Sequence, residues 1–268
     1  MQLIEVPAKT GYVWFRQGIW LFRKNPLAFL TLFFTYLLAM MLISQIPVIG
    51  GFLPLVFIPG VAVGFMAACR DTIAGKPVFP TILADGFRSY GSTAAKRLAA
   101  LGLLYVVAMA LVLGGSALAD GGTLLKVMIG AASMEPEAMA SSDIPLGILA
   151  ALAFYIPVAM LFWFSPILIT WHEVPPVKAM FFSLVSCWRN RGAFIVFGAL
   201  WFAMAITVSL GLSTLMQALG AGEYAFVVLM PATIVVTTML YCSFYATYRG
   251  CFGIQSPETP GSPTTPAA

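Results

Sequence analysis

Charged residues are scarce in this chain. Only 9% of its 268 residues are Asp, Glu, Lys or Arg, whereas hydrophobic residues make up 60%. A soluble domain carries about 25% charged and about 45–50% apolar residues. Because so few charges cannot cover a surface of this size with polar groups, lipid must replace water around most of it. The composition excludes a soluble globular domain and predicts an integral membrane protein.

Signatures of catalysis and of metal binding are also missing. The sequence has no G-x-x-x-x-G-K-[ST], H-E-x-x-H or G-x-S-x-G motif, and its four cysteines show no C-x-x-C spacing. The single histidine, His172, has only Glu173 beside it, which favours an interfacial anchor over a metal ligand. We therefore predict no metal, no cofactor and no enzymatic activity. The 14 basic residues form no groove-sized patch, so nucleic acid is not an expected partner.

Six apolar stretches are long enough to cross a hydrocarbon core, which takes about 20 helical residues. No stretch contains Asp, Glu, Lys, Arg or His, which argues against transport coupled to protons or charge. The first two are separated by a tight QIPVIGG turn, where a pair of half-length re-entrant segments is the alternative. The predicted spans are residues 27–46, 49–68, 98–117, 148–170, 193–215 and 226–248.

The placement of Lys and Arg predicts the orientation of the chain. With these spans, 13 of the 14 basic residues lie on one side of the membrane, the side that is cytoplasmic in bacterial inner-membrane proteins. Both termini are expected there. We divide the chain into a cytoplasmic amphipathic segment (1–26), a six-helix transmembrane domain (27–248) and a disordered cytoplasmic tail (249–268), whose QSPETPGSPTTPAA sequence lacks core-forming residues.

An amphipathic segment precedes each odd-numbered span and is expected to lie in the membrane surface. The third is the clearest. The apolar faces that we expect comprise Tyr12, Phe15, Ile19 and Phe22 in the first segment, Phe79, Ile82, Leu83 and Phe87 in the second, and Val177, Met180, Phe181, Leu184, Val185 and Trp188 in the third. Asn25-Pro-Leu-Ala28-Phe29 and Asn190-Arg-Gly-Ala193-Phe194 are also similar. The predicted fold is an all-α membrane protein with six transmembrane helices, in three repeats of an amphipathic surface helix plus a helical hairpin.

Three stretches resemble a family of uncharacterised bacterial inner-membrane proteins with six spans. These are VPAKTGYVWFRQGIWLFRKNPLAFL, PGVAVGFMAACRD and VKAMFFSLVSCWRNRGAF. The resemblance covers nearly the whole chain apart from the tail, and it implies a location in the inner membrane and no established activity. The chain also resembles, loosely, the membrane-embedded portion of some glycerophosphodiester phosphodiesterases. Their catalytic chemistry belongs to a separate soluble domain, so no catalytic residue carries over.

The second and fourth spans hold the clearest shape-determining residues. Gly60, Gly64 and Ala68 form a small-xxx-small ladder, which predicts close packing against another helix of this chain or of a second subunit. Pro54, Pro59, Pro157 and Pro166 are predicted to kink the second and fourth spans, and broken helices in two repeats are also typical of a transporter site.

The sixth span carries a polar stripe. Thr237, Tyr241, Tyr245 and Tyr248 share one helical face, which predicts a seam of interhelical hydrogen bonds or the lining of a polar crevice. In the loop after the third span, Glu135 and Glu137 are read as solvated charges rather than as a weak cation site.

The residues favour a non-enzymatic protein that acts through helix and lipid contacts, as an assembly or envelope-homeostasis factor. Its expected partners are membrane lipids, especially anionic lipid at the cytoplasmic leaflet, and a membrane-protein partner or a second copy of the chain. The alternative is a transporter or lipid-handling protein for neutral or amphiphilic molecules. A membrane enzyme ranks third, and the residues at its disposal include Arg70-Asp71 and His172-Glu173.

Overall fold

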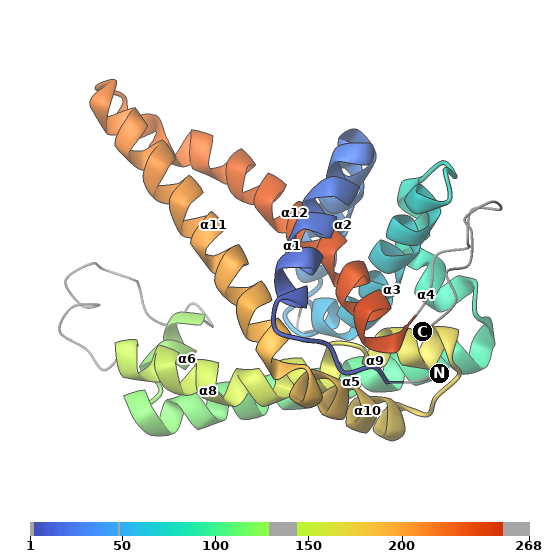
Figure 1. Cartoon of the computed structure of the whole chain (residues 1–268). Helices are drawn as coiled ribbons and strands as arrows, with labels where there is room; N and C mark the ends of the chain where they lie inside the picture. Colours follow the sequence, from blue (N-terminus) through green and yellow to red (C-terminus); the bar gives the residue numbers. More distant parts are fainter. Residues whose placement is uncertain (1–2, 48, 129–143, 254–268) are drawn as a thin grey trace. The chain divides into compact units, whose positions relative to one another are not determined.

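The computed structural model of the chain describes residues 3–47, 49–128 and 144–253 (Figure 1). Within these ranges the regular structure is helical and contains no strand. The elements are α1 (Thr10–Lys24), α2 (Pro26–Ser44), α3 (Leu53–Ile73), η1 (Pro80–Ala84), α4 (Asp85–Arg88), α5 (Gly91–Asp120), α6 (Thr123–Met128), α8 (Ile144–Phe162), α9 (Ser165–Trp171), α10 (Pro176–Arg189), α11 (Arg191–Ala218), η2 (Gly222–Tyr224) and α12 (Ala225–Phe252).

Six segments among the described residues are long and apolar enough to cross a membrane. They are α2, α3, α5, α8 together with α9, α11, and α12 with η2, and each coincides with one predicted span. Because α2 has 19 residues and α3 has 21, the first two are full-length helices rather than half-length segments. The all-α fold with six spans is confirmed. Residues 249–252, which we had assigned to the tail, belong to α12.

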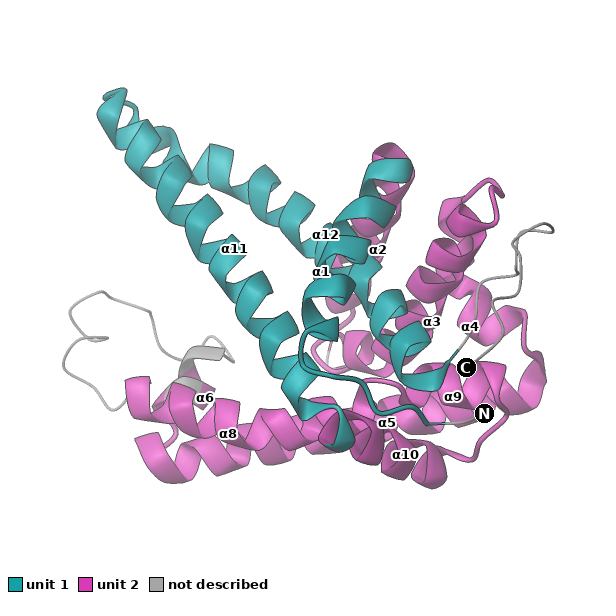
Figure 2. Ribbon diagram, in the orientation of Figure 1, with its two compact units in different colours: residues 1–24, 189–268 teal, residues 25–188 magenta. Residues whose placement is uncertain are grey.

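The chain forms two compact units (Figure 2). Unit 1 comprises residues 1–24 and 189–268 and contains α1, α11 and α12. Unit 2 comprises residues 25–188 and contains the helices from α2 to α10. The first helix of the chain therefore belongs to the same compact unit as the last two.

In unit 1, α1 packs against both α11 and α12 near the ends that lie away from the η2 turn. Gly11 faces the carbonyl of Ala193 in the first turn of α11, and Gly18 faces Met239 and Ser243 in α12. A β-carbon on either glycine would overlap these atoms. With 28 residues each, α11 and α12 are about 42 Å long, about 12 Å more than the hydrocarbon core needs. When the η2 turn lies at one membrane surface, the segments that α1 covers reach the headgroup region at the other.

In unit 2, the short elements η1 and α4 pack against α3. Gly60 faces the ring of Phe87 and the backbone of Gly86, and Gly64 faces Ile82 and Leu83. Further along the chain, α5 packs against α3 and α8. The helix α10 packs against the junction of α8 and α9 through Ser183, whose hydroxyl contacts backbone atoms of both sides of the junction.

One packing pattern therefore occurs three times. Each element that precedes an odd-numbered span packs against an even-numbered span: η1 and α4 against the second, α10 against the fourth, and α1 against the sixth. A small residue lies at each crossing, namely Gly86, Ser183 or Gly18. In the first and third segments this small residue lies seven positions before Asn25 or Asn190. The shared register supports the repeat that the sequence indicates.

The apolar faces predicted for the surface segments are distributed between buried and exposed positions. Tyr12 is exposed, whereas α1 buries Gly11, Trp14, Gly18, Leu21 and Phe22. In α10 the large residues Val177, Phe181 and Trp188 are exposed, and the buried residues are Ala179, Ser183, Ser186 and Cys187. The middle segment is not one amphipathic helix but a 3-10 turn followed by a single α-helical turn. In α10, close helix packing selects small residues and leaves large apolar ones exposed, as is common between membrane helices. In α1, the packing face combines two glycines with the large residues Trp14, Leu21 and Phe22.

Candidate functional site

The exposed face of α1 carries alternating aromatic and basic side chains. Tyr12, Arg16, Trp20 and Lys24 follow one another at four-residue steps and so lie along one side of the helix. We call these four residues the α1 stripe. The Arg16 guanidinium carbon lies 5.8 Å from the centre of the Tyr12 ring, and the Lys24 ammonium nitrogen lies 4.4 Å from that of Trp20. Each cation is thus held over an aromatic face.

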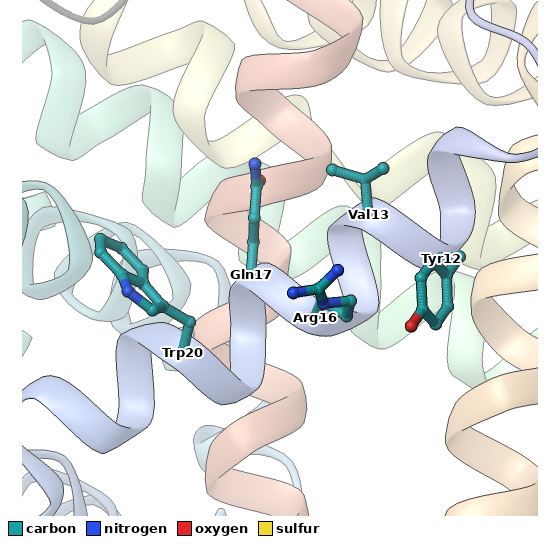
Figure 3. A pocket seen from close by; sticks show the side chains of 5 residues that line it. All are labelled: Tyr12, Val13, Arg16, Gln17 and Trp20. Carbon is teal, nitrogen blue, oxygen red and sulfur yellow. The ribbon is translucent and has the colours of Figure 1, made fainter.

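A shallow depression of about 220 Å³ opens on the same face of α1. Its lining consists of Tyr12, Val13, Arg16, Gln17 and Trp20, which Figure 3 shows with Arg16 and Gln17 between the two aromatic rings. Tyr12 and Trp20 are each 49% exposed. The depression offers guanidinium and amide N–H donors flanked by aromatic surface, and no carboxylate lines it.

A second depression, of about 210 Å³, lies between α1 and α12. It shares Val13 and Gln17 with the first and adds Arg249, whose guanidinium carbon lies 6.0 Å from the centre of the Tyr245 ring. Its lining also lacks acidic residues. Each of the two depressions, which share Val13 and Gln17, is therefore lined by an arginine, Arg16 in the first and Arg249 in the second.

An extended segment before α1 ties the ends of unit 1 together. Asn190 accepts a hydrogen bond from the Val6 N–H at 2.8 Å and donates one to the Ile4 carbonyl at 3.1 Å. The Ile4 N–H donates to the carbonyl of Cys251 at 2.8 Å. Asn190 is buried, so these bonds satisfy its amide and fix the point from which α1 starts.

Positive charge dominates the end of unit 1 at which α1 lies. Among the described residues there, the one acidic side chain is Glu5, which forms an ion pair with Arg189. The basic residues of this region are Lys9, Arg16, Arg23, Lys24, Arg189, Arg191 and Arg249. The surface therefore favours an anionic ligand.

Unit 2 has its own polar cluster at the ends of three spans. Trp171, at the end of α9, donates its indole N–H to the Tyr90 hydroxyl at 2.8 Å, and its ring lies 5.2 Å from the guanidinium carbon of Arg70. The Arg70 Nε donates to the Asp71 carboxylate at 3.0 Å. The sequence singled out Arg70 and Asp71, but nothing in their spacing indicated Tyr90 or Trp171.

The segment that follows α9 belongs to the same cluster. Arg97 donates to the Glu173 carbonyl at 2.6 Å, and Glu173 adopts a positive φ of 56°. This left-handed conformation is costly for a residue other than glycine, and the bond from Arg97 helps to hold it. Partial burial lowers the pKa of the His172 imidazole and so favours its uncharged form. The cluster links α3, α5 and α9 but presents no nucleophile activated by a base.

The fourth span is broken between α8 and α9. The Ser183 hydroxyl of α10 accepts a hydrogen bond from the Phe164 N–H at 2.9 Å and donates one to the Met160 carbonyl at 2.7 Å. Ser165 donates to the carbonyl of Leu161 at 2.5 Å. Phe164, Ser165 and Ser183 are fully buried. The break is therefore closed by a side chain of another helix, as backbone at membrane depth requires.

The four prolines named from the sequence take two different positions. Pro59 and Pro157 lie inside α3 and α8, where a missing N–H removes a helical hydrogen bond. Pro54 and Pro166 lie in the first turns of α3 and α9, where no N–H is needed, so each starts a helix instead of kinking one. Sequence reasoning missed Pro231, which lies inside α12.

The glycine ladder of the second span lies on the face of α3 that receives η1 and α4. Gly60 and Gly64 are the points of closest approach, and Ala68 is fully buried one turn further along. The structure thus places the ladder against a neighbouring segment of the same chain. The short helix α4, which packs against the ladder, contains Gly86, and the backbones of Gly60 and Gly86 lie in close contact.

The polar stripe of the sixth span is partly buried. Tyr245 and Tyr248 are buried, with their ring centres 6.4 Å apart, whereas Thr237 and Tyr241 are half-buried. A second set of hydroxyls on α12 was missed. Thr238, Ser243 and Thr247 are fully buried, and each donates to a carbonyl three or four residues earlier in the helix.

Some predictions lie outside the described residues. These include Glu135, Glu137 and most of the predicted tail, residues 254–268. Within the described part of the chain, no three His, Cys, Asp or Glu side chains gather in a way that would hold a metal ion.

The six apolar helices and the packing of small residues between them define a multi-pass α-helical membrane protein. A protein of Burkholderia thailandensis described as a probable inner membrane protein is 68% identical over 267 residues, which is 99% of each chain. This chain belongs to the same family of bacterial inner-membrane proteins. No protein-family model matches the sequence, and no solved structure matches it.

Proposed function

We propose that this inner-membrane protein is not an enzyme and acts through helix and lipid contacts, as an assembly or envelope-homeostasis factor with both termini in the cytoplasm. The observation that carries the proposal is the exposure of aromatic side chains on α1 and α10. Both helices cross a span through a small residue, Gly18 or Ser183, and expose aromatic side chains, including Trp20 at 49% and Trp188 at 62%. Exposed tryptophan side chains of membrane proteins favour the headgroup region of a bilayer.

The distribution of charge supports the orientation. The basic residues of α1 and the start of α11 lie at one end of unit 1, and Glu223 lies in the η2 turn that joins the other ends of α11 and α12. Lys and Arg are retained on the cytoplasmic side, so the end of the hairpin that carries the basic residues, opposite the η2 turn, is assigned to the cytoplasm. The anionic lipids of that leaflet then face the basic residues of α1.

A complementation experiment tests the proposal. Cells that lack the protein receive the wild type or the double variant Trp20→Ala/Trp188→Ala, and membrane insertion and envelope permeability to a hydrophobic dye are measured. The double variant should insert normally and fail to restore the envelope barrier. The matched control, Phe202→Ala/Phe226→Ala, truncates residues that are 69% and 74% exposed on α11 and α12, and should restore it. Full complementation by the tryptophan variant would contradict a role for the two surface helices.

The broken fourth span favours a second candidate, a transporter or lipid-handling protein for neutral or amphiphilic molecules. Discontinuous helices line the binding sites of many transporters. Purified protein in liposomes should then move a fluorescent phospholipid or a neutral solute across the bilayer, and Ser183→Ala should change the rate. Liposomes that show only background movement would reject this candidate.

A further inference from the structure

The α1 stripe is a more specific feature than a generally basic surface. Arg16 and Lys24 project from the same side of one helix, two turns apart, and each lies over the ring of the aromatic residue one turn before it. Within the described residues, neither cation forms an ion pair. An anion that binds here displaces no carboxylate.

We propose that the α1 stripe binds the phosphate of an anionic phospholipid, with Arg16 as the contacting cation, Gln17 as an additional donor, and Lys24, two turns further along the helix, as a second positive charge that attracts the phosphate without touching it. Tyr12 and Trp20 lie against the glycerol backbone and the upper acyl chains. The proposal rests on the lipid-contact function above and names the lipid class and the residues that recognise it.

Charge selects this class of lipid. Phosphatidylcholine carries a quaternary ammonium that neutralises its own phosphate, whereas phosphatidylglycerol leaves the phosphate charge available to Arg and Lys. The planar guanidinium of Arg16 donates to two phosphate oxygens at once, and the Lys24 ammonium acts as a point charge. Neither depression beside Gln17 is lined by an acidic residue, so nothing at the site repels a phosphate.

The depth of α1 also fits a headgroup. Gly18 packs against Met239 and Ser243, which lie 14 and 18 residues after the start of α12. At about 1.5 Å per residue, this crossing lies about 21–27 Å from the η2 end, near the far boundary of a hydrocarbon core about 30 Å thick. The middle of α1 therefore lies at the level where phosphates and tryptophan side chains meet.

The corresponding positions of α10 lack this pattern. When Asn25 is aligned with Asn190, the α1 stripe matches Val177, Phe181, Val185 and Arg189. Three of these four are apolar. The phosphate site is therefore assigned to α1 and not to surface helices in general.

The test uses the full-length protein in phosphatidylcholine nanodiscs with increasing fractions of brominated phosphatidylglycerol. Bromine quenches nearby indoles, and the signal of Trp20 is obtained by subtracting a Trp20→Phe variant made in each background. The fluorescence of Trp20 in the wild type should fall by half at a low fraction of brominated phosphatidylglycerol. The same loss of fluorescence should need a much higher fraction of brominated phosphatidylcholine. A juxtamembrane cation contributes about fivefold, so Arg16→Gln/Lys24→Gln should raise the half-quenching fraction by about 25-fold.

The matched control is Arg88→Gln/Lys178→Gln, which removes the same charge from exposed positions of α4 and α10. It should change the half-quenching fraction by less than about twofold. Because all four side chains are exposed, both double variants should keep the thermal unfolding midpoint of the wild type, which the same samples report.

Three other outcomes would overturn the phosphate site on α1. If the wild type prefers phosphatidylglycerol and Arg16→Gln/Lys24→Gln keeps that preference, the phosphate site on α1 is wrong while the general lipid-contact function stands. If both double variants lose the preference equally, net charge alone attracts the lipid and the site is again wrong. If the wild type shows no preference for phosphatidylglycerol, both the site and the anionic-lipid part of the proposed function are overturned.

Discussion

The helices α1 and α10 share one register and differ in the surface that they turn away from the protein. Both bury small residues at the crossing with a span, Gly18 in α1 and Ser183 in α10. Outside, α1 presents alternating aromatic and basic residues, whereas α10 presents Val177 and Phe181. When Asn25 is aligned with Asn190, the buried positions of the two helices coincide, but α1 fills them with large residues such as Trp14 and Phe22 where α10 has Ala179 and Cys187.

The crossing of α1 with α12 should tolerate substitution least. Leucine at Gly18 would place its side chain inside the space of Ser243, so Gly18→Leu should destabilise unit 1 by about 3 kcal/mol or more. Gly198→Leu is the matched control, because Gly198 is exposed on α11 with no atom near its β-carbon position. Thermal unfolding in detergent measures both. Equal midpoints for the two variants would show that α1 does not pack closely against α12.

The equivalent crossing of α10 depends on hydrogen bonds instead of close approach. Ser183→Ala leaves the Phe164 N–H and the Met160 carbonyl without the hydroxyl that joins them, and should cost about 2 kcal/mol. Thr35→Ala removes a hydroxyl that donates only to its own helix, at the Thr31 carbonyl, and should cost far less. Hydrogen exchange at Phe164 should also accelerate in Ser183→Ala. Unchanged exchange there would mean that α10 does not close the broken span.

The segment that leads into α10 carries backbone strain at Glu173. Glycine adopts a positive φ without steric cost, so Glu173→Gly should stabilise the protein by about 1 kcal/mol. A lower unfolding midpoint would show that the Glu173 side chain contributes more than its backbone conformation costs.

The difference between the outer faces is tested by transferring one charge. Phe181→Arg places a cation at the position of α10 that matches Arg16, on a side chain that is 59% exposed. It should raise the affinity for phosphatidylglycerol by about fivefold with little effect on stability. Phe181→Gln controls for the loss of the ring. No gain from arginine would mean that the rest of the α1 stripe is needed to bind phosphate.

The six spans could be read from the sequence because a chain can cross lipid as a helix only with about 20 apolar residues in a row. The repeat could be read in part, since Asn25 and Asn190 mark the same register. Which face of α1 and of α10 is buried could not be read from the sequence. In α10 the large apolar residues are exposed, and the packing face consists of small residues such as Ala179, which carry little hydrophobic signal. In α1 the packing face includes Trp14 and Leu21, which lie outside the predicted face.

The candidate sites show the same limit. The sequence did not indicate that Arg16 lies in a stripe with Trp20, because this depends on which side of α1 is buried. Pro166 indicated a disturbance in the fourth span, but only the fold brings Ser183 to it from α10. Contacts between segments far apart in the sequence, such as Trp171 with Tyr90, leave no local spacing to detect.

The most direct test of the account is whether the outer faces of α1 and α10 meet lipid. Nitroxide labels are placed on Tyr12→Cys and Val177→Cys, whose parent side chains are 49% and 75% exposed, and on Ala179→Cys at a buried position. Collision with oxygen dissolved in the bilayer is then measured by electron paramagnetic resonance in nanodiscs. We predict mobile labels with high oxygen collision at 12 and 177, and an immobile, shielded label at 179. Shielded labels at 12 and 177 would show that these faces of α1 and α10 do not meet lipid.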